Sequence, residues 1–157
     1  TRIAQAQAAV LQGHQIENHS WDHPDFTRLS DAQLIEQVDS TNDIIWQTLG
    51  VKTRFVRPPK GRINVTQGIP IWDMGYGVSS WNLDSKDYVT SLGWTPESVY
   101  QEITTRIDAS NPARDSFIIL MHDSSAAPRL GDIIVAIKAK DYRLVTLNEC
   151  ADAGRQH

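Results

Sequence analysis

The sequence has little of several features that would mark a class of protein. Among its 157 residues there is a single cysteine, Cys150, so no disulfide can form within the chain. No apolar run approaches the roughly 20 residues of a membrane-spanning helix. The net charge is −4 and no basic run occurs, which argues against a surface for nucleic acid or for an anionic membrane. With no repeats or low-complexity tracts either, the length predicts one globular domain with a packed core.

What the sequence does contain is an alternation of helical and strand-like segments. Ser30 and Gln33 form a capping box at the start of one helix, and Gly50 ends it. Thr95 and Pro96 mark the start of another. Helices are predicted at 2–12, 30–50, 64–74, from 95 and at 131–140, with strands at 14–18, 55–56, 76–81, 117–121 and 143–146. This alternation predicts a parallel α/β sheet or barrel.

Polar clusters follow four of the predicted strands, at residues 19–23, 57–61, 84–87 and 122–123. In parallel α/β folds the carboxyl ends of the strands share one rim, where binding and catalytic groups gather. We therefore expect three histidines, an arginine and two aspartates near one pocket. A helix-start or loop conformation would let His19 and His23, four residues apart, share one metal ion.

Each of these residues has a structural alternative. His19 and His23 could be surface histidines, and His122 could cap a strand by hydrogen bonding. Arg57 and Asp87 could form an ordinary ion pair across a loop. Most of the tryptophans are expected in core or half-buried packing rather than as sugar platforms: Trp21, Trp46, Trp72 and Trp94.

Four motifs together resemble the NodB-like polysaccharide deacetylases, carbohydrate esterase family 4. HSWDH at 19–23 matches the family's H-[ST]-x-x-H, and RPPKG at 57–61 matches R-x-P-x-G. DSKDY at 84–88 matches D-x-x-D-W except in its last residue, and LMH at 120–122 matches L-x-H. The residues around these motifs are most similar to those of fungal chitin deacetylases. The resemblance implies an incomplete (β/α) barrel of the NodB-homology type over residues 1–150, with 151–157 as a C-terminal tail.

The resemblance also implies roles for individual residues. His19 and His23 would bind one divalent metal, most often zinc in this family. His122 would be the general acid that protonates the leaving amine, and Asp87 would hold its imidazole. Arg57 would orient a catalytic carboxylate, and the backbone N–H of Lys60 would complete an oxyanion site. The remaining residues would contact the acetyl group or sugar: Pro59, Trp81, Tyr88 and Leu120.

Three departures from the family pattern matter. Lys60 replaces the usual tyrosine, and Tyr88 replaces tryptophan. The family also opens with T-F-D-D-G, whose aspartates act as general base and third metal ligand, but no adjacent Asp-Asp pair occurs here. We therefore expect the first strand or strands to be missing from this chain and to be supplied by an upstream N-terminal segment, which would also hold a partner for Cys150.

The expected function is removal of acetyl groups from N-acetylglucosamine-containing polysaccharide, such as chitin or chito-oligomers, by a secreted or cell wall-associated enzyme. Two alternatives stay open. Without the aspartate pair, the chain could be a non-catalytic carbohydrate-binding homologue. The same residues would also serve an acetylxylan esterase, because O-acetylated xylan presents the same carbonyl group.

Overall fold

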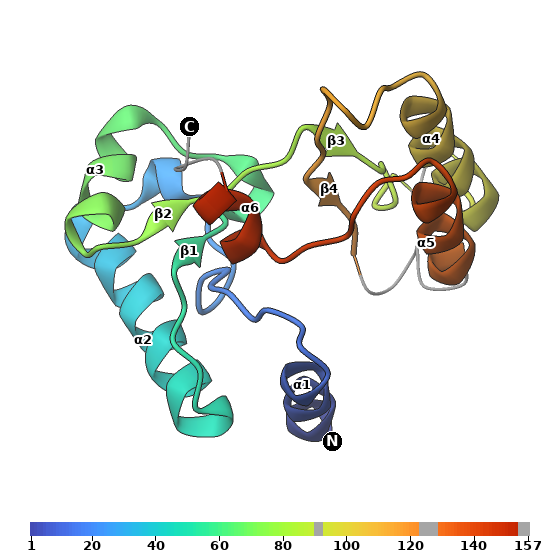
Figure 1. Cartoon of the computed structure of the whole chain (residues 1–157). Helices are drawn as coiled ribbons and strands as arrows, with labels where there is room; N and C mark the ends of the chain where they lie inside the picture. Colours follow the sequence, from blue (N-terminus) through green and yellow to red (C-terminus); the bar gives the residue numbers. More distant parts are fainter. Residues whose placement is uncertain (90–92, 123–128, 154–157) are drawn as a thin grey trace. The chain divides into compact units, whose positions relative to one another are not determined.

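The computed structural model describes residues 1–89, 93–122 and 129–153 (Figure 1). The chain folds as two compact units. The first unit contains residues 1–80 together with the C-terminal residues from Val145, and the second unit contains residues 81–144. Each unit is described by itself below.

The first unit contains α1 (Arg2–Leu11), α2 (Asp31–Leu49), α3 (Val65–Asp73) and α6 (Leu147–Ala153). The predicted capping box at α2 is present: the Ser30 hydroxyl accepts the Gln33 N–H, and the Gln33 side chain accepts the Ser30 N–H at 3.0 Å. Gly50 ends α2 in the left-handed conformation, with φ of 66°. The helices predicted at 2–12, 30–50 and 64–74 are thus confirmed to within two residues.

The sheet of the first unit is short. β1 (Phe55–Val56) pairs in parallel with β2 (Gly77–Val78), and Asn18 adds a single parallel bridge to Val56. Of the strand predicted at 14–18, only Asn18 pairs with another strand, so the prediction is wrong for residues 14–17. The physical reason is that the Glu17 carboxylate accepts the N–H groups of Arg54 and Phe55, at 2.8 and 2.9 Å, in place of a backbone ladder.

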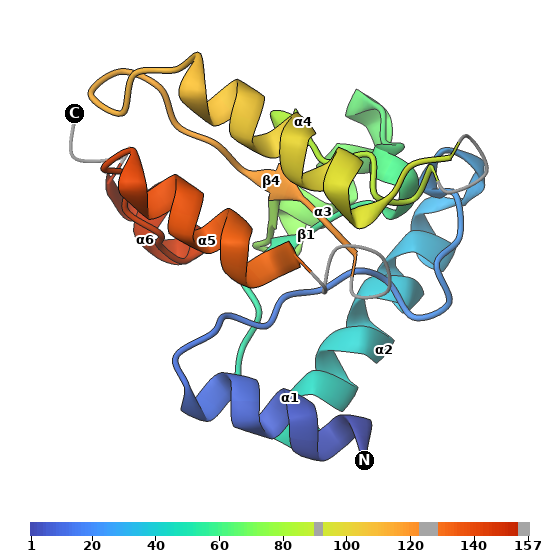
Figure 2. The same ribbon diagram turned by 90° about the vertical axis from the view of Figure 1, so that its right-hand side faces the viewer.

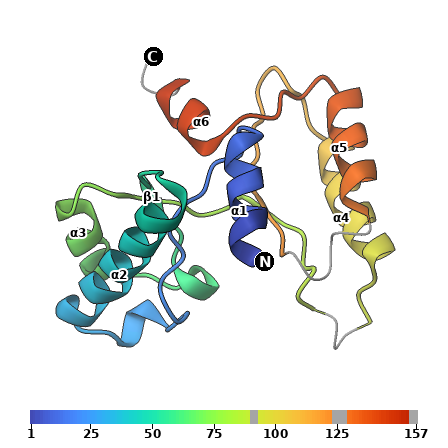
Figure 3. The ribbon, with the colours of Figure 1, turned by 90° about the horizontal axis from the view of Figure 1, so that it is seen from below.

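α2 and α3 pack against one another, as Figure 3 shows, and α3 also contacts β2. Between them lies a core of fully buried side chains: Phe26, Leu34, Val38, Val56 and Ile71. Each such side chain contributes about 1.5–3 kcal/mol by leaving water. This core fixes β1 and the loops that leave its carboxyl end.

Gly77 in β2 is expected to tolerate no side chain. A Cβ at this position would lie 2.7 Å from Cδ1 of Phe55, closer than carbon atoms approach. Gly77→Ala should lower the free energy of unfolding by about 1–3 kcal/mol, as other overpacked sites do. Gly68→Ala is the matched control, because nothing lies within 4 Å of its Cβ and alanine favours the helix by about 1 kcal/mol. Urea unfolding of both variants measures the difference; equal stability of Gly77→Ala and the natural chain would contradict the prediction.

The second unit contains β3 (Leu83–Asp84), α4 (Pro96–Asp108), β4 (Ile119–Leu120) and α5 (Leu130–Ala139). β3 and β4 are parallel, with Asp84 opposite Leu120. α4 and α5 lie side by side (Figure 2). Their apolar faces form the core of this unit: Leu83, Val99, Ile103, Ile107, Ile133 and Ile137. The helix predicted from residue 95 is confirmed, with Thr95 as its N-cap.

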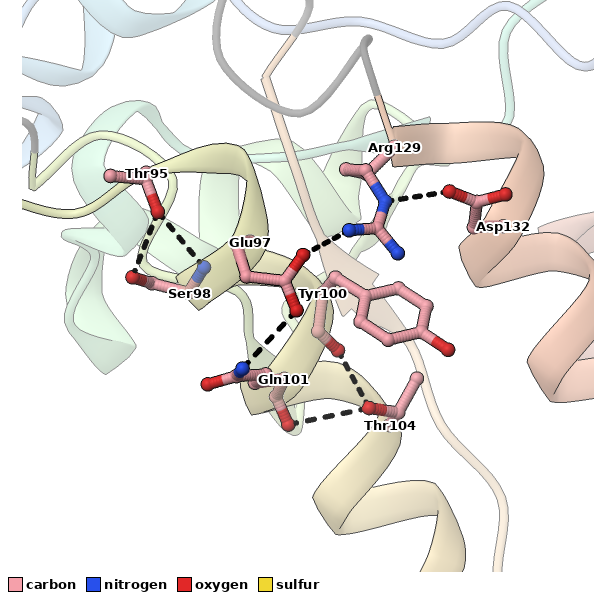
Figure 4. Close-up of polar contacts among 8 residues, drawn as sticks. All are labelled: Thr95, Glu97, Ser98, Tyr100, Gln101, Thr104, Arg129 and Asp132. Atoms are coloured by element: carbon pink, nitrogen blue, oxygen red, sulfur yellow. Dashed lines mark hydrogen bonds and ion pairs between the residues drawn. The ribbon is translucent and has the colours of Figure 1, made fainter.

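Arg129 joins the two helices of the second unit at one end (Figure 4). Its guanidinium pairs with Glu97 of α4 and, at 2.6 Å, with Asp132 of α5. It also lies 4.1 Å from the centre of the Tyr100 ring. The hydrogen bond to Asp132 is the main reason that the Arg129 pKa lies above its usual value. These contacts hold the start of α5 against α4.

Several predicted elements differ from the structure. The strand predicted at 143–146 is absent, and the helix α6 that follows it was not predicted. The predicted tail boundary after residue 150 falls inside α6. β3 lies outside every predicted strand, and its second residue, Asp84, belongs to the polar cluster noted at residues 84–87. Among the described residues, no helix is long and apolar enough to cross a membrane.

Candidate functional site

The first unit brings the two predicted metal ligands close together. The ring centres of His19 and His23 lie 5.1 Å apart, edge to face at 77°. His19 follows the bridge between Asn18 and Val56, so it leaves the sheet at the carboxyl ends of the parallel strands. Arg57 leaves β1 beside it, and its carbonyl oxygen accepts a 2.6 Å hydrogen bond from Nδ1 of His19.

The histidine loop, residues 19–23, is held by the side chains of Asn18, which precedes it, and Gln37 of α2. Asn18 is buried; its amide nitrogen donates to a carbonyl of α2, and its amide oxygen accepts the Ser20 N–H at 2.9 Å. Gln37 of α2 accepts the N–H groups of Trp21 and Asp22, at 3.1 and 3.2 Å. The backbone of the loop is therefore fixed before any ligand binds.

Backbone strain is concentrated in the motif segments. The described part of the chain contains five non-glycine residues with positive φ, and four of them lie in these segments. The four are Ser20 (68°), His23 (62°), Lys60 (57°) and Lys86 (56°). Each such residue costs of order 1–3 kcal/mol and is kept only where the surroundings demand it, which is typical of functional loops. At His23 the surroundings include a hydrogen bond from its N–H to the Ser20 hydroxyl.

The arginine segment forms a tight turn after β1. Pro59 is buried, whereas Lys60 is exposed. The Arg57 side chain is half-buried, and burial lowers its pKa from the usual value. Among the described residues of its own unit, no carboxylate forms an ion pair with Arg57. A half-buried guanidinium stays charged at neutral pH, so this position favours a carboxylate partner from elsewhere.

The second unit pairs the remaining predicted catalytic groups. Asp84 and Leu120 are opposite one another in β3 and β4, so the segments that leave these strands emerge at the same edge. There the buried Asp87 carboxylate accepts two hydrogen bonds from His122, one from the backbone N–H at 2.5 Å and one from Nδ1 at 2.7 Å. The Asp87 side chain is 0% exposed and that of His122 is 41% exposed. Nε2 of His122 is therefore the ring nitrogen directed away from its anchor.

The predicted substrate contacts lie in different environments. Tyr88 is exposed, with its ring centre 5.7 Å from that of His122. Trp81 is half-buried. Leu120 is buried within β4, and Pro59 is buried in the turn after β1. Contact of these four residues with a substrate stays a prediction, as does convergence of the groups of the two units at one pocket.

The histidine pair fits part of a metal site. Because a carbonyl oxygen only accepts, the bond to Arg57 places the proton of His19 on Nδ1 and the lone pair on Nε2. Metal-binding histidines are typically oriented by such an outer contact. Among residues 1–89, 93–122 and 129–153, no group of three or more His, Cys, Asp or Glu side chains could hold an ion. The described residues therefore bring together two candidate ligands, His19 and His23, and metal binding by this pair stays a prediction.

This combination of loops can be compared with known proteins. Residues 2–78 match the family model described as polysaccharide deacetylase. The chain belongs to the polysaccharide deacetylase family. The family assignment made from the four motifs is thus confirmed.

Individual relatives of this deacetylase-family chain include both bacterial and fungal proteins. The peptidoglycan-N-acetylmuramic acid deacetylase PdaC of Bacillus subtilis is 32% identical over 149 residues, which are 94% of this chain and 29% of that enzyme. The solved structure of the chitin deacetylase from Colletotrichum lindemuthianum has a TM-score of 0.83 at 25% identity, covering 94% of this chain and 66% of that one. A family pseudoenzyme from Bacillus anthracis has a TM-score of 0.81 at 25% identity, covering 94% and 50%.

These likenesses determine the fold class. The matched structures belong to the deacetylase family, and the match covers nearly all of this chain but half to two thirds of theirs. The fold is therefore an incomplete α/β barrel, as the resemblance implied. The chain spans only part of the length of the relatives it matches.

Reasoning from the sequence missed two residues that support the site. Asn18 lies directly before His19, and its polar side chain in a predicted strand was the available signal. Gln37 lies on α2, fifteen residues or more from the groups it binds, and no local pattern marks it. Three tryptophans expected in packing are instead exposed, namely Trp21, Trp46 and Trp72. Trp94 is half-buried as predicted.

Asp25 is expected to make the histidine loop sensitive to acid. Its carboxylate accepts a 2.6 Å hydrogen bond from the Thr27 hydroxyl and pairs with Arg62 at 2.9 Å, which together lower its pKa to about 2. A carboxyl group with a lowered folded-state pKa contributes stability above its unfolded pKa, and that contribution is lost as pH falls through about 2. Asp25→Asn should therefore unfold more easily than the natural chain above about pH 4, and the difference should vanish near about pH 2.

Urea unfolding across this pH range measures the effect of Asp25. Thr27→Val removes the hydrogen bond that lowers the Asp25 pKa most, without changing the size of the side chain. This variant should narrow the pH range between the folded-state and unfolded-state pKa of Asp25, over which the stability difference is lost. A difference between the natural chain and Asp25→Asn that is independent of pH would contradict the assignment.

Proposed function

We propose that this chain forms the larger part of a metal-dependent deacetylase domain that removes acetyl groups from N-acetylglucosamine-containing polysaccharide. The observation that carries the proposal is the His122–Asp87 pair in a chain of the polysaccharide deacetylase family. The buried carboxylate holds Nδ1, so Nε2 is the nitrogen available to exchange a proton with a substrate. This arrangement suits a general acid that protonates a leaving amine.

The histidine pair would hold the metal. Nε2 of His19, oriented through the carbonyl of Arg57, and a ring nitrogen of His23 would be two ligands. Zinc, the metal expected from the resemblance, supplies Lewis-acid activation of water and of the acetyl carbonyl group when it is bound. The third ligand and the general base would be carboxylates from outside the described residues.

The half-buried Arg57 supports a catalytic carboxylate supplied from outside the described residues. Its guanidinium lies where a catalytic carboxylate would relieve the cost of burial, and the resulting ion pair would orient that carboxylate. The backbone N–H of Lys60, in a turn held at φ of 57°, would donate to the developing oxyanion. We propose these two roles together, because both groups follow β1 within four residues.

Acetate release is the direct test. The protein, in a form that includes an upstream Asp-Asp segment, is incubated with chito-oligomers, with peptidoglycan fragments and with acetylated xylan. We expect acetate release from the N-acetylated glycans, its loss after chelation and its return when zinc is added. Activity that resists the chelator would contradict the metal mechanism, and faster turnover of acetylxylan would shift the substrate to O-acetyl groups.

The choice between chitin-type and peptidoglycan substrates depends on the same assay. The chitin deacetylase of Colletotrichum lindemuthianum is 28% identical over 141 residues, against 32% for PdaC. Both substrates present N-acetyl groups on a sugar polymer outside the membrane, which supports a secreted or cell wall-associated protein. We propose chito-oligomers as the first substrate because the Colletotrichum structure matches this chain with a TM-score of 0.83, against 0.76 for the structure of PdaC.

A second candidate is a non-catalytic carbohydrate-binding homologue. Two observations favour it: the similarity to the Bacillus anthracis pseudoenzyme, and a described ligand set of only two histidines. In that case chito-oligomers would bind, measured by calorimetry, with no acetate released by any form of the protein. Release of acetate by the form with the Asp-Asp segment would exclude this candidate.

A further inference from the structure

Tyr88 lies against the imidazole that Asp87 holds. The two ring centres, of Tyr88 and His122, are 5.7 Å apart, and the ring planes are inclined at 78°. This edge-to-face geometry is the favourable one for aromatic pairs, worth about 0.5–1.5 kcal/mol beyond simple burial. Tyr88 is nevertheless 55% exposed, so packing alone does not fix its ring.

A hydrogen bond to the sheet fixes the ring instead. The Tyr88 hydroxyl donates to Oδ2 of Asp84 at 3.0 Å, and this bond is the main reason that the Tyr88 pKa is raised. The hydroxyl therefore remains a donor at neutral pH. Asp84 belongs to β3, and its other oxygen accepts the Lys86 N–H at 2.9 Å, which closes the turn leading to Tyr88.

The turn is anchored at a further point. The Lys86 ammonium group pairs with Glu102 of α4 at 3.1 Å and lies 5.2 Å from the centre of the Trp94 ring. Asp84 of β3 thus accepts hydrogen bonds from two residues of this turn, Lys86 and Tyr88. The Lys86 side chain attaches the other side of the turn to α4. These contacts of the turn fix the position of the Tyr88 backbone.

The His122 ring needs a second restraint. Its Nδ1–H bond to Asp87 sets the position of one edge, but a single hydrogen bond leaves the ring able to pivot about that contact. The side chain is 41% exposed, so surrounding protein does not enclose it. The edge-to-face contact with Tyr88 opposes the pivot and so limits where Nε2 points.

We propose that Tyr88, held by its hydrogen bond to Asp84, is a positioning residue that restrains the His122 imidazole. The inference rests on the proposed function, in which Nε2 of His122 delivers a proton. In this arrangement the hydroxyl of Tyr88 acts on the reaction through His122 and not through the substrate. Its loss should affect the rate of the chemical step more than substrate binding.

Tyr88→Phe tests the hydroxyl while keeping the ring. Losing one hydrogen bond of ordinary strength should lower the population of correctly placed imidazole, and with it kcat, by about fivefold. KM should change by less than about twofold, because the loss falls on the transition state. Tyr142→Phe is the matched control: Tyr142 lies in the same unit and its hydroxyl bonds to Ser110 at 2.6 Å, away from His122. It should keep both constants.

A second readout needs no substrate. Long-range proton–nitrogen NMR spectra show the imidazole signals of the protein's five histidines, and a His122→Gln sample assigns those of His122. In Tyr88→Phe, the ring-current shift of the His122 carbon-bound protons should fall toward the value in Tyr88→Ala. Tyr142→Phe should leave these signals unchanged.

The outcomes separate this inference from the proposed function. Unchanged His122 signals in Tyr88→Phe would overturn it, whether or not the protein releases acetate. A raised KM with unchanged kcat would also overturn it, because the hydroxyl would then serve substrate binding. If no form releases acetate, the proposed function fails, whereas a changed His122 spectrum would still support the restraint.

Discussion

His122→Ala is expected to lower kcat/KM for acetate release by about 10²- to 10⁴-fold, the range found when a general acid is removed. The reason is structural: the buried Asp87 carboxylate occupies Nδ1 of His122, so Nε2 is the nitrogen of this residue that would serve the leaving amine. Asp87→Asn should also cost activity, because an amide in this position no longer holds the protonated imidazole. Initial rates with chito-oligomers measure both.

The control for this experiment is another histidine. His14 is exposed and lies before the histidine loop, outside every contact described for the site. His14→Ala should keep the activity of the natural protein. A loss below about tenfold for His122→Ala would show that a different group supplies the proton.

Zinc binding is expected to depend on both histidines and on a ligand that the described residues lack. Catalytic zinc normally has three protein ligands, and the structure brings together two, His19 and His23. The 157-residue chain should therefore bind zinc weakly. A form that adds an Asp-Asp segment before Thr1 should bind roughly a hundredfold more tightly or better, since even lost outer contacts cost 10- to 100-fold.

Calorimetric titration of both forms measures the difference, with single replacements as controls. His19→Ala and His23→Ala should each remove most of the affinity of the longer form, whereas His14→Ala should not. Equal, tight binding by the two forms would show that a residue within this chain completes the site. In that case our assignment of the third ligand to an upstream segment would be wrong.

The helices of this protein could be predicted from local chemistry. Side-chain caps at Ser30 and Thr95 satisfy backbone groups within three residues, so the pattern that specifies each helix start is complete in the sequence. The buried residues of α4, Val99, Ile103 and Ile107, recur at helical spacing, so this pattern too is complete in the sequence. The strands were harder, because their partners are distant: β3 lies in a polar segment and exists through pairing with β4, some 36 residues later.

By itself, the sequence determined the family, the helices and the four motif segments, because each depends on residue types at short, fixed spacing. The tertiary structure decided which side chains meet. It placed the Arg57 carbonyl on His19, the buried carboxylate of Asp87 on His122, and the Tyr88 ring beside that histidine. It also left Trp72 exposed where composition favoured packing. Such contacts depend on parallel strands that bring their carboxyl ends to one edge, and pairing over that distance leaves no local pattern in the chain.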